Sequence, residues 1–413
     1  MSERAIKTKS WPAGVNNIAP DYALPTDQYG KQIHLRAAIN IDFLDNGQVR
    51  SRKGKQRVYT GATHSFWSDG TTALFVENGV LKRLETNLTG TALRSGLSNA
   101  RMQYHPINGE IYFSNGIDSG IYRGGSVREW GVENPPSPPT AVSANGLLPN
   151  GRYQLICTFV NLYGEESGCM QASAYDVTTG GLTVTLPQPI SAEVVKINLY
   201  ATPPDGDQFY LSAVAAINQT IPLIDEPVYG RTLRTQFCKK MIPGELLEVY
   251  RGIVYAAVGN IVWHSEPFNY GLYKPAKNYM PMPAEVTVMG ATQNGLYIIS
   301  DSTRYFAGTG PADFVAQEAA PYGAAKYSAV SMKDGLSVVW RSQRGISRGD
   351  DGGGTIVNLQ EDRVYPEQVT QGTTLIREQD SLKQIVSVGF SAPYPSGLVA
   401  SDYWEADVIT QRS

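Results

Sequence analysis

Residues able to do chemistry are few in this chain, and they are widely spaced. The four histidines are His34, His64, His105 and His264, and no two are close enough in the sequence to suggest a metal site or a catalytic pair. The phosphate-binding glycine loop, the Gly-x-Ser-x-Gly turn, the His-Glu-x-x-His helix and the Cys-x-x-Cys pair are all missing. We therefore predict that the chain is not an enzyme and uses no metal or cofactor.

Two pairs of adjacent acidic residues are the remaining options. Glu165-Glu166 could act as paired carboxylates in sugar cleavage, but neighbours on a strand point to opposite faces, so a turn is the better interpretation. Asp350-Asp351 precedes three glycines and could bind Ca²⁺, yet it lacks the alternating carboxylates of a calcium loop. Neither pair predicts an active site.

Basic residues form the strongest charged feature. Five cations fall within eight residues: Arg50, Arg52, Lys53, Lys55 and Arg57. They could contact phosphates or an acidic neighbouring subunit, or form a solvated hairpin tip, and the sequence does not separate these alternatives. Together with Trp11, a potential anchor for a neighbour's pocket, they are the candidate subunit and docking contacts.

The composition indicates an all-β protein. Among 413 residues there are 41 Gly and 25 Pro, only 18% of residues are charged, and no long stretch has helical periodicity. The net charge of −3 gives no global attraction to nucleic acid or membranes. No apolar run approaches the roughly 20 residues of a membrane span. The first ten residues lack the apolar core of a secretory signal, and the three cysteines are too few for a disulfide framework, so we expect buried thiols.

The elements that must position these residues repeat as pairs of short strands joined by glycine-containing turns. Asn108-Gly109, Arg251-Gly252, Asn294-Gly295 and Asp334-Gly335 each precede a β-branched or aromatic run. Apart from one long gap, the copies recur about every 40 residues, the period of a propeller blade. We predict a β-propeller-like body of about five to six blades, with a weak last copy around Ser381–Phe390.

Changes in composition divide the chain into four segments. Residues 1–34 form a Pro-punctuated extended arm. Residues 35–133 begin with an early hairpin, whose first strand is the alternating run Ala37–Phe43, and continue with two blades. The hairpin could close the ring by pairing with the last blade. Residues 134–235 follow a polyproline linker and suit an inserted fibronectin-III-like β-sandwich. Residues 236–413 hold blades three to six and the C-terminal tail.

Four groups of residues resemble the tail nozzle proteins of short-tailed bacteriophages, also called tail hub or packaged-DNA stabilisation proteins. The groups are Gly14-Val15-Asn16-Asn17 with Leu24-Pro25; Ala37–Phe43 with Asn46-Gly47 and Arg50–Gly54; Thr158–Asn161 with Gly164–Ser167 and Asn198–Tyr200; and Gly252–Tyr255 leading to Trp263–Pro267. Each is a turn or hairpin signature. Their order and spacing, which extend over most of the chain, make the resemblance specific.

The resemblance implies a structural virion protein of the tail, made in the host bacterial cytoplasm. It implies a propeller with an inserted sandwich, assembled as a homohexameric ring below the portal and head-to-tail adaptor, around the channel through which genomic DNA is ejected. Expected partners are further copies, the adaptor and tail fibre or needle proteins, and the ring could also contact the host cell surface. The alternative is a receptor- or glycan-binding propeller of a tail fibre or host-recognition apparatus, which a trimeric state would favour.

Overall fold

The computed structural model describes residues 10–24, 26, 28, 33–39, 41–44, 47–51, 58–332, 334–360, 363–364, 368–379, 382–390 and 406–411. Over these residues the regular structure is almost entirely β-strand. The helical structure among them is one 3-10 turn, η1 (Asp21–Ala23). The predicted all-β class is confirmed.

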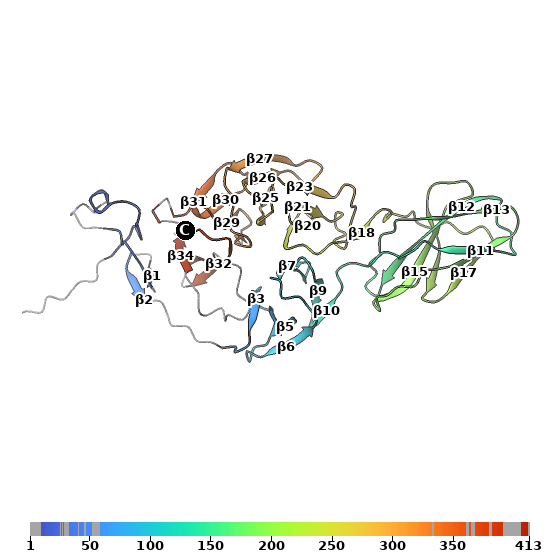
Figure 1. Ribbon diagram of the computed structural model, residues 1–413, viewed down its shortest axis with the longest axis horizontal. Helices are drawn as coiled ribbons and strands as arrows, with labels where there is room; N and C mark the ends of the chain where they lie inside the picture. The colour runs from blue at the N-terminus through green and yellow to red at the C-terminus, as the bar shows by residue number, and fades with distance from the viewer. Residues whose placement is uncertain are drawn as a thin grey trace, which may run out of the picture.

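Six antiparallel sheets follow one another around a ring, which we call the ring body (Figure 1). The first five sheets have four strands each and the sixth has three. In chain order the strands are β3 (Thr63–Ser68), β4 (Ala73–Glu77), β5 (Val80–Leu84) and β6 (Gly90–Arg94); β7 (Gln103–Ile107), β8 (Glu110–Ser114), β9 (Ser119–Arg123) and β10 (Ser126–Arg128); β19 (Leu246–Tyr250), β20 (Ile253–Val258), β21 (Ile261–His264) and β23 (Tyr279–Pro281); β24 (Val288–Ala291), β25 (Gly295–Ile299), β26 (Thr303–Ala307) and β27 (Val315–Ala320); β28 (Val330–Ser331), β29 (Ser337–Ser342), β30 (Gly345–Asp350) and β31 (Ile356–Asn358); and β32 (Gln371–Gln379), β33 (Leu382–Phe390) and β34 (Ala406–Gln411).

The tight turns of the ring body follow from residue pairs that accept positive φ. Asn108 and Gly109 have φ of 51° and 80°, and Arg251 and Gly252 have φ of 46° and 74°, as a two-residue hairpin turn of the primed type requires. Gly295 is different, because it is the first residue of β25 and a Cβ there would lie 2.3 Å from the Tyr305 ring. That glycine is needed for close packing and not for a turn.

Apolar side chains fill the space between consecutive sheets, which explains why each strand pair needs its neighbours. One buried pair represents each of the five clusters, in order around the ring: Leu74 and Phe113, Tyr112 and Val254, Tyr255 and Leu296, Tyr297 and Trp340, and Val339 and Ile385. The sixth sheet is also contacted by Arg101, in the connection between the first and second sheets, whose guanidinium donates to the Gly372 carbonyl of β32 at 2.9 Å.

The insert between the second and third sheets is a two-sheet sandwich. Its sheets have the orders β11-β14-β17 and β13-β12-β15-β16, and a single apolar core lies between them. β11 and β12 lie in opposite sheets, whereas the first two strands of an immunoglobulin-type sandwich share a sheet. The strand order thus departs from the immunoglobulin-type arrangement. The strands are β11 (Thr140–Ala144), β12 (Gly151–Asn161), β13 (Ser173–Val177), β14 (Gly181–Thr185), β15 (Val194–Ala201), β16 (Tyr210–Ala216) and β17 (Thr220–Leu223).

The early hairpin does not close the ring. β1 (Ile41–Phe43) pairs with β2 (Val49–Ser51), and the described residues give these two strands no further partner strand. The sixth sheet instead takes its third strand, β34, from the C-terminal part of the chain. The long strand expected over Ala37–Phe43 is also reduced to three residues. We expected ring closure because edge strands need partners, but β34 fills the position beside β33.

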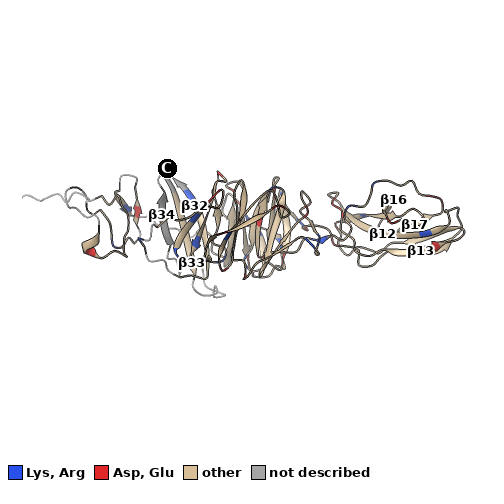
Figure 2. Ribbon diagram, turned by 90° about the horizontal axis from the view of Figure 1, so that it is seen from above, with Lys and Arg blue, Asp and Glu red and all other residues tan. Residues whose placement is uncertain are grey.

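The three parts of the molecule lie in a row. The N-terminal hairpin is at one end, the ring body is in the middle, and the sandwich projects from the opposite side (Figures 1 and 2). A short sheet of β18 (Lys239–Lys240) and β22 (Leu272–Tyr273) lies where the chain returns from the sandwich to the ring body.

Candidate functional site: the junction between ring body and sandwich

The predicted docking residues are only partly described. The backbone N–H of Trp11, which is half-buried, donates to the Gly47 carbonyl at 2.6 Å, so the arm packs on the hairpin turn. Arg50 lies on β2 opposite Asp42. Arg52, Lys53, Lys55 and Arg57 lie outside the described residues.

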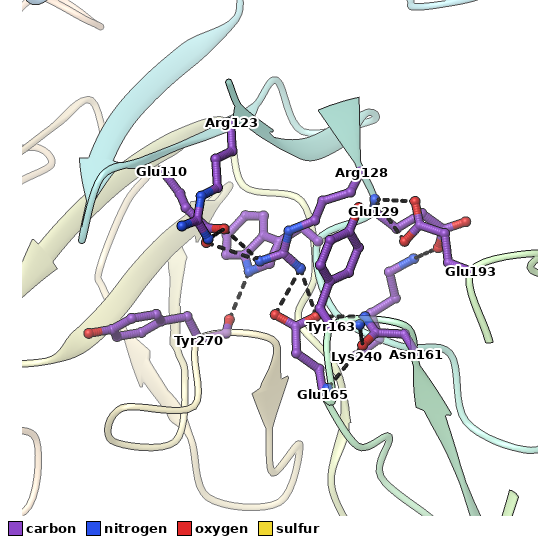
Figure 3. A network of polar contacts seen from close by, with 11 residues as sticks. Glu110, Arg123, Arg128, Glu129, Asn161, Tyr163, Glu165, Glu193, Lys240 and Tyr270 are labelled. Carbon is purple, nitrogen blue, oxygen red and sulfur yellow. Dashed lines mark hydrogen bonds and ion pairs between the residues drawn. The ribbon is translucent and has the colours of Figure 1, made fainter. Parts of the chain in front are cut away.

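The densest polar network of charged side chains lies elsewhere, where the sandwich joins the ring body (Figure 3). Arg128, the last residue of β10, reaches from the ring body to the loop after β12. Its Nη1 donates to both carboxylate oxygens of Glu165 at 2.8 Å, and its Nη2 donates to the Glu110 carboxylate at 3.0 and 3.2 Å. The Tyr163 ring covers the guanidinium, with 4.4 Å between Cζ and the ring centroid. One cation thus ties a sandwich loop to the second sheet.

Burial makes this arginine depend on its partners. The Arg128 side chain is 8% exposed, and its desolvation alone would lower its pKa. The hydrogen bonds and charges of Glu165 and Glu110 outweigh that effect, so the pKa of Arg128 is raised. A buried cation held by two carboxylates is costly to unpair, and the contact therefore fixes the orientation of the loop.

Glu166, the neighbour of Glu165, is directed to the sandwich itself. Its Oε1 accepts hydrogen bonds from Thr158 Oγ1, from Asn198 Nδ2 at 2.9 Å and from Tyr200 Oη at 2.7 Å. Its Oε2 pairs with Arg231 at 2.7 Å, on the segment that returns to the ring body. The two glutamates therefore bind different partners, and both carboxylates are engaged in holding the loop.

A second cation completes the junction on the return path. Lys240 Nζ lies 3.0 Å from Glu129 and 3.1 Å from Glu133, which follow β10. Burial would lower the pKa of Lys240, but these two carboxylates raise it. The backbone N–H of Glu129 in turn donates to Glu193 of the sandwich at 3.1 Å. The outgoing and returning chain segments are thereby linked to each other and to the sandwich.

Close backbone contact supports the ion pairs. Gly131 has φ of 78°, and a Cβ there would lie 2.6 Å from the Gly271 carbonyl oxygen. The adjacent Trp130 is buried and donates from Nε1 to the Tyr270 carbonyl at 2.8 Å. The chain thus leaves the ring body pressed against the loop that precedes β22, beside a cavity of about 130 Å³.

A larger groove lies between the ring body and the sandwich, with a volume of about 1060 Å³. Its walls include Ile117 from the ring body, Met170 and Ile190 from the sandwich, and Lys240 from the return path. The junction therefore combines a tightly paired polar contact with an open groove.

The charged residues of the junction form ion pairs and hydrogen bonds between the ring body and the sandwich. Within the described residues, no group of three or more His, Cys, Asp or Glu side chains is placed to hold a metal ion. The histidines are separate: His105 Nε2 lies 2.9 Å from Glu248, while His34, His64 and His264 have lowered pKa values because of burial. No helix in the described part of the chain has the length and apolar character needed to cross a membrane.

Sequence reasoning identified the loop but not its partner. Gly164-Glu165-Glu166-Ser167 stood out as a turn, whereas Arg128 gave no signal, because 37 residues separate it from Glu165 and the contact depends on how two sheets meet. The one local hint was a charged residue at the end of a strand, directly before Glu129-Trp130-Gly131.

Comparisons with known proteins gave distant structural likenesses only. No protein-family model and no curated protein sequence matches the chain. Solved structures similar to it include Kluyveromyces lactis Hsv2, with 9% identity, coverage of 86% of this chain and 98% of that chain, and a TM-score of 0.32. They also include the WD40 β-propeller domain of Doa1, with 10% identity, coverage of 80% and 90%, and a TM-score of 0.31. The extracellular domain of BT4673 from B. thetaiotaomicron has 10% identity, coverage of 91% and 48%, and a TM-score of 0.35. At such TM-scores these likenesses support no functional argument.

Proposed function

We propose that this protein is a non-enzymatic structural subunit of the tail of a tailed bacteriophage. In this proposal several copies, six in the form that the sequence resemblance implies, build the distal tube or nozzle around the DNA exit channel. The subunit would dock the head-to-tail adaptor on one side and fibre or needle proteins on the other.

One observation supports this proposal most strongly: residues of the family-like motifs hold the sandwich on the ring body. Glu165 and Glu166 of the third motif group bind Arg128 and Arg231. In the fourth group, Ser265 is fully buried and accepts the Val254 N–H at 3.0 Å, a contact within the third sheet of the ring body. Copies of a symmetric assembly must present their docking surfaces in one fixed relation, so a firmly attached sandwich suits an assembly subunit.

The charge balance is compatible with a DNA conduit. Each phosphate that a protein neutralises adds salt-dependent affinity, which would slow the passage of DNA. The net charge of −3 avoids that penalty, while Arg50, Arg52, Lys53, Lys55 and Arg57 concentrate cations in one short stretch. We expect this stretch to meet a neighbouring subunit or an acidic partner, where grouped charges orient docking.

The alternative is a receptor- or glycan-binding propeller. Exposed aromatic side chains near the junction favour it, since sugars stack on such rings: Phe268 is 79% exposed and Tyr163 is 50% exposed. Binding of the purified chain to host surface polysaccharide, lost in Phe268→Ala, would support this alternative.

Electron microscopy of the purified assembly tests the main proposal. We expect rings with an open axial channel and sandwiches at a constant position around them. Single particles without rotational symmetry, at concentrations well above those used for storage, would contradict it. Replacing the five clustered cations by Gln is expected to slow ring formation most at low salt and to leave duplex DNA binding weak.

A further inference from the structure

We propose that the groove between ring body and sandwich is a docking site for residues 391–405 of a second copy of this chain. The inference rests on the proposed function, because it assigns one contact between neighbouring subunits.

The groove exposes long apolar side chains from both bodies. Ile117, in the turn between β8 and β9, is 68% exposed, Met170 is 42% exposed, and Ile190, between β14 and β15, is fully exposed. They belong to three separate connections that converge on one groove. Exposed apolar residues gathered in this way mark an interaction site more often than isolated ones do.

Several charged side chains of the groove already have polar partners within the chain, although Lys239 in its lining is exposed. Lys240 lies between Glu129 and Glu133, Arg94 donates to the Ser119 carbonyl at 2.8 Å, and Asp118 accepts from Ser98 at 2.7 Å. The exposed apolar side chains therefore give the groove its main affinity for a partner and favour an apolar segment.

Phe237 adds a second, independent sign of an interaction surface. Its φ is 62°, a conformation that is unfavourable for a bulky residue, and yet its side chain is 56% exposed. Its N–H donates to the Cys169 carbonyl at 2.8 Å, next to Met170. The chain thus holds an aromatic ring outward beside the groove without gaining burial for it.

The same chain contains a segment of matching chemistry. Residues 391–401 have no charged side chain, and they include Pro393-Tyr394-Pro395 and Leu398-Val399. Proline restricts the residue before it to extended conformations, and such segments bind grooves lined by apolar and aromatic side chains. Tyr273 and Pro243 line this groove.

The placement of the ends of this segment favours another copy as its source. Both of its ends leave from one place, because β33 and β34 pair at Val388 and Ala406. A loop of 15 residues can extend to about 25 Å, half its contour length. The sixth sheet and the junction lie on opposite sides of the ring body (Figure 1), so the segment leaves each chain on the side away from that chain's own groove.

A labelled peptide of residues 391–405 tests the inference by fluorescence polarisation with the full chain. We expect saturable binding that Ile190→Asp weakens at least tenfold. The matched control is Val142→Asp, at a side chain 67% exposed on the sandwich but absent from the groove lining, and it should leave binding unchanged. No binding, equal effects of the two variants, or preferential binding of a peptide of residues 1–9 would overturn the proposal.

Phe237→Gly provides a readout that a purely structural role would not give. Glycine relieves the positive φ, so the melting temperature should rise while peptide affinity falls at least threefold. A fall in both would assign Phe237 to packing within the chain and remove its role in the interface. If rings form but the peptide does not bind, this inference fails while the proposed function stands.

Discussion

The ring body has two attachments, and they differ in kind. The sandwich is attached through buried charges, with Arg128 and Lys240 each placed between two carboxylates. Among the described residues, the contacts of the N-terminal arm with the ring side include a backbone bond, in which the Asn17 N–H donates to the Arg363 carbonyl at 2.9 Å. Buried ion pairs impose one geometry, whereas single backbone bonds at the surface do not.

In the hairpin of β1 and β2, a charged side chain is buried while neighbouring apolar side chains are partly exposed. Asp42 of β1 is buried, whereas its neighbours Ile41 and Phe43 are only half-buried and Ile39 is 81% exposed. A two-stranded sheet with a wet apolar side is marginal by itself. The comparison suggests that the sandwich belongs to the folded subunit, while the hairpin keeps an apolar side available for a neighbour.

The largest expected effect comes from Gly131→Ala. A Cβ at this position would lie 2.6 Å from the Gly271 carbonyl in a backbone of positive φ, so strain and overpacking should together cost about 3–4 kcal/mol of unfolding free energy. The control is Gly164→Ala, where φ is also positive at 82° but no atom lies within 4 Å, and where about 1 kcal/mol is expected. Chemical denaturation measures both, and equal losses would show that the close approach is unimportant.

Arg128→Met should cost about 3 kcal/mol, because at a partly buried site it leaves Glu165 without its cation and Glu110 with only the exposed Arg123, 3.5 Å away. The lower end of the usual range applies, since Glu165 is 36% exposed. Limited proteolysis should then cut between ring body and sandwich. Arg123→Met is the control: that side chain is 73% exposed, and the change should stay within about 0.5 kcal/mol. If Arg128→Met remains as resistant to proteolysis as the parent chain, the claim that buried ion pairs hold the sandwich on the ring body is wrong.

Acidification should stabilise the surroundings of His105 in the ring body and destabilise those of His34 in the N-terminal arm. Burial lowers the pKa of His105, but the hydrogen bond and charge interaction with Glu248 outweigh burial and raise this pKa above 6.5. The contribution of His105 to folding stability is therefore complete below about pH 6.5 and is lost as pH rises. Burial and, to a smaller extent, the charge of Arg363 lower the pKa of His34. The contribution of His34 to folding stability is therefore present above about pH 6.5 and is lost as pH falls.

Hydrogen exchange at pH 5.5 and 7.5 measures this difference, after correction for intrinsic rates. Between the two values, acid should increase protection of β7 and β19 and decrease it around His34. His105→Gln should abolish only the first response. If both regions respond in the same direction in the parent chain, the assignment of these groups is wrong.

The smallest effect on the single chain is expected from Ile39→Asn. Because Ile39 is 81% exposed, the monomer should lose less than about 0.5 kcal/mol, while assembly should weaken clearly. Deleting residues 2–30 should behave in the same way. Sedimentation velocity and thermal melting of the same samples separate the two effects, and a monomer that unfolds would place the arm in its core.

Local patterns predicted the elements better than their connections. The Asn-Gly and Arg-Gly turns and the alternating strands could be predicted because each depends on residues adjacent in sequence. The pairing of Arg128 with Glu165 could not, since it depends on how the second sheet meets the loop after β12. The early hairpin misled us because its alternation satisfies a strand pattern, but β34 occupies the position it would have taken. Phe237 gave no signal, because only Gly and Asn announce a positive φ.

Native mass spectrometry of the purified protein tests the central claim most directly. We expect a dominant species of six chains of 45.0 kDa each, which dissociates in Ile39→Asn, forms more slowly in the five-Gln variant and persists in Arg123→Met. A stable trimer would favour the receptor-binding alternative. A chain that remains monomeric under all conditions, while fully folded, would contradict the proposal that it is a ring-forming subunit.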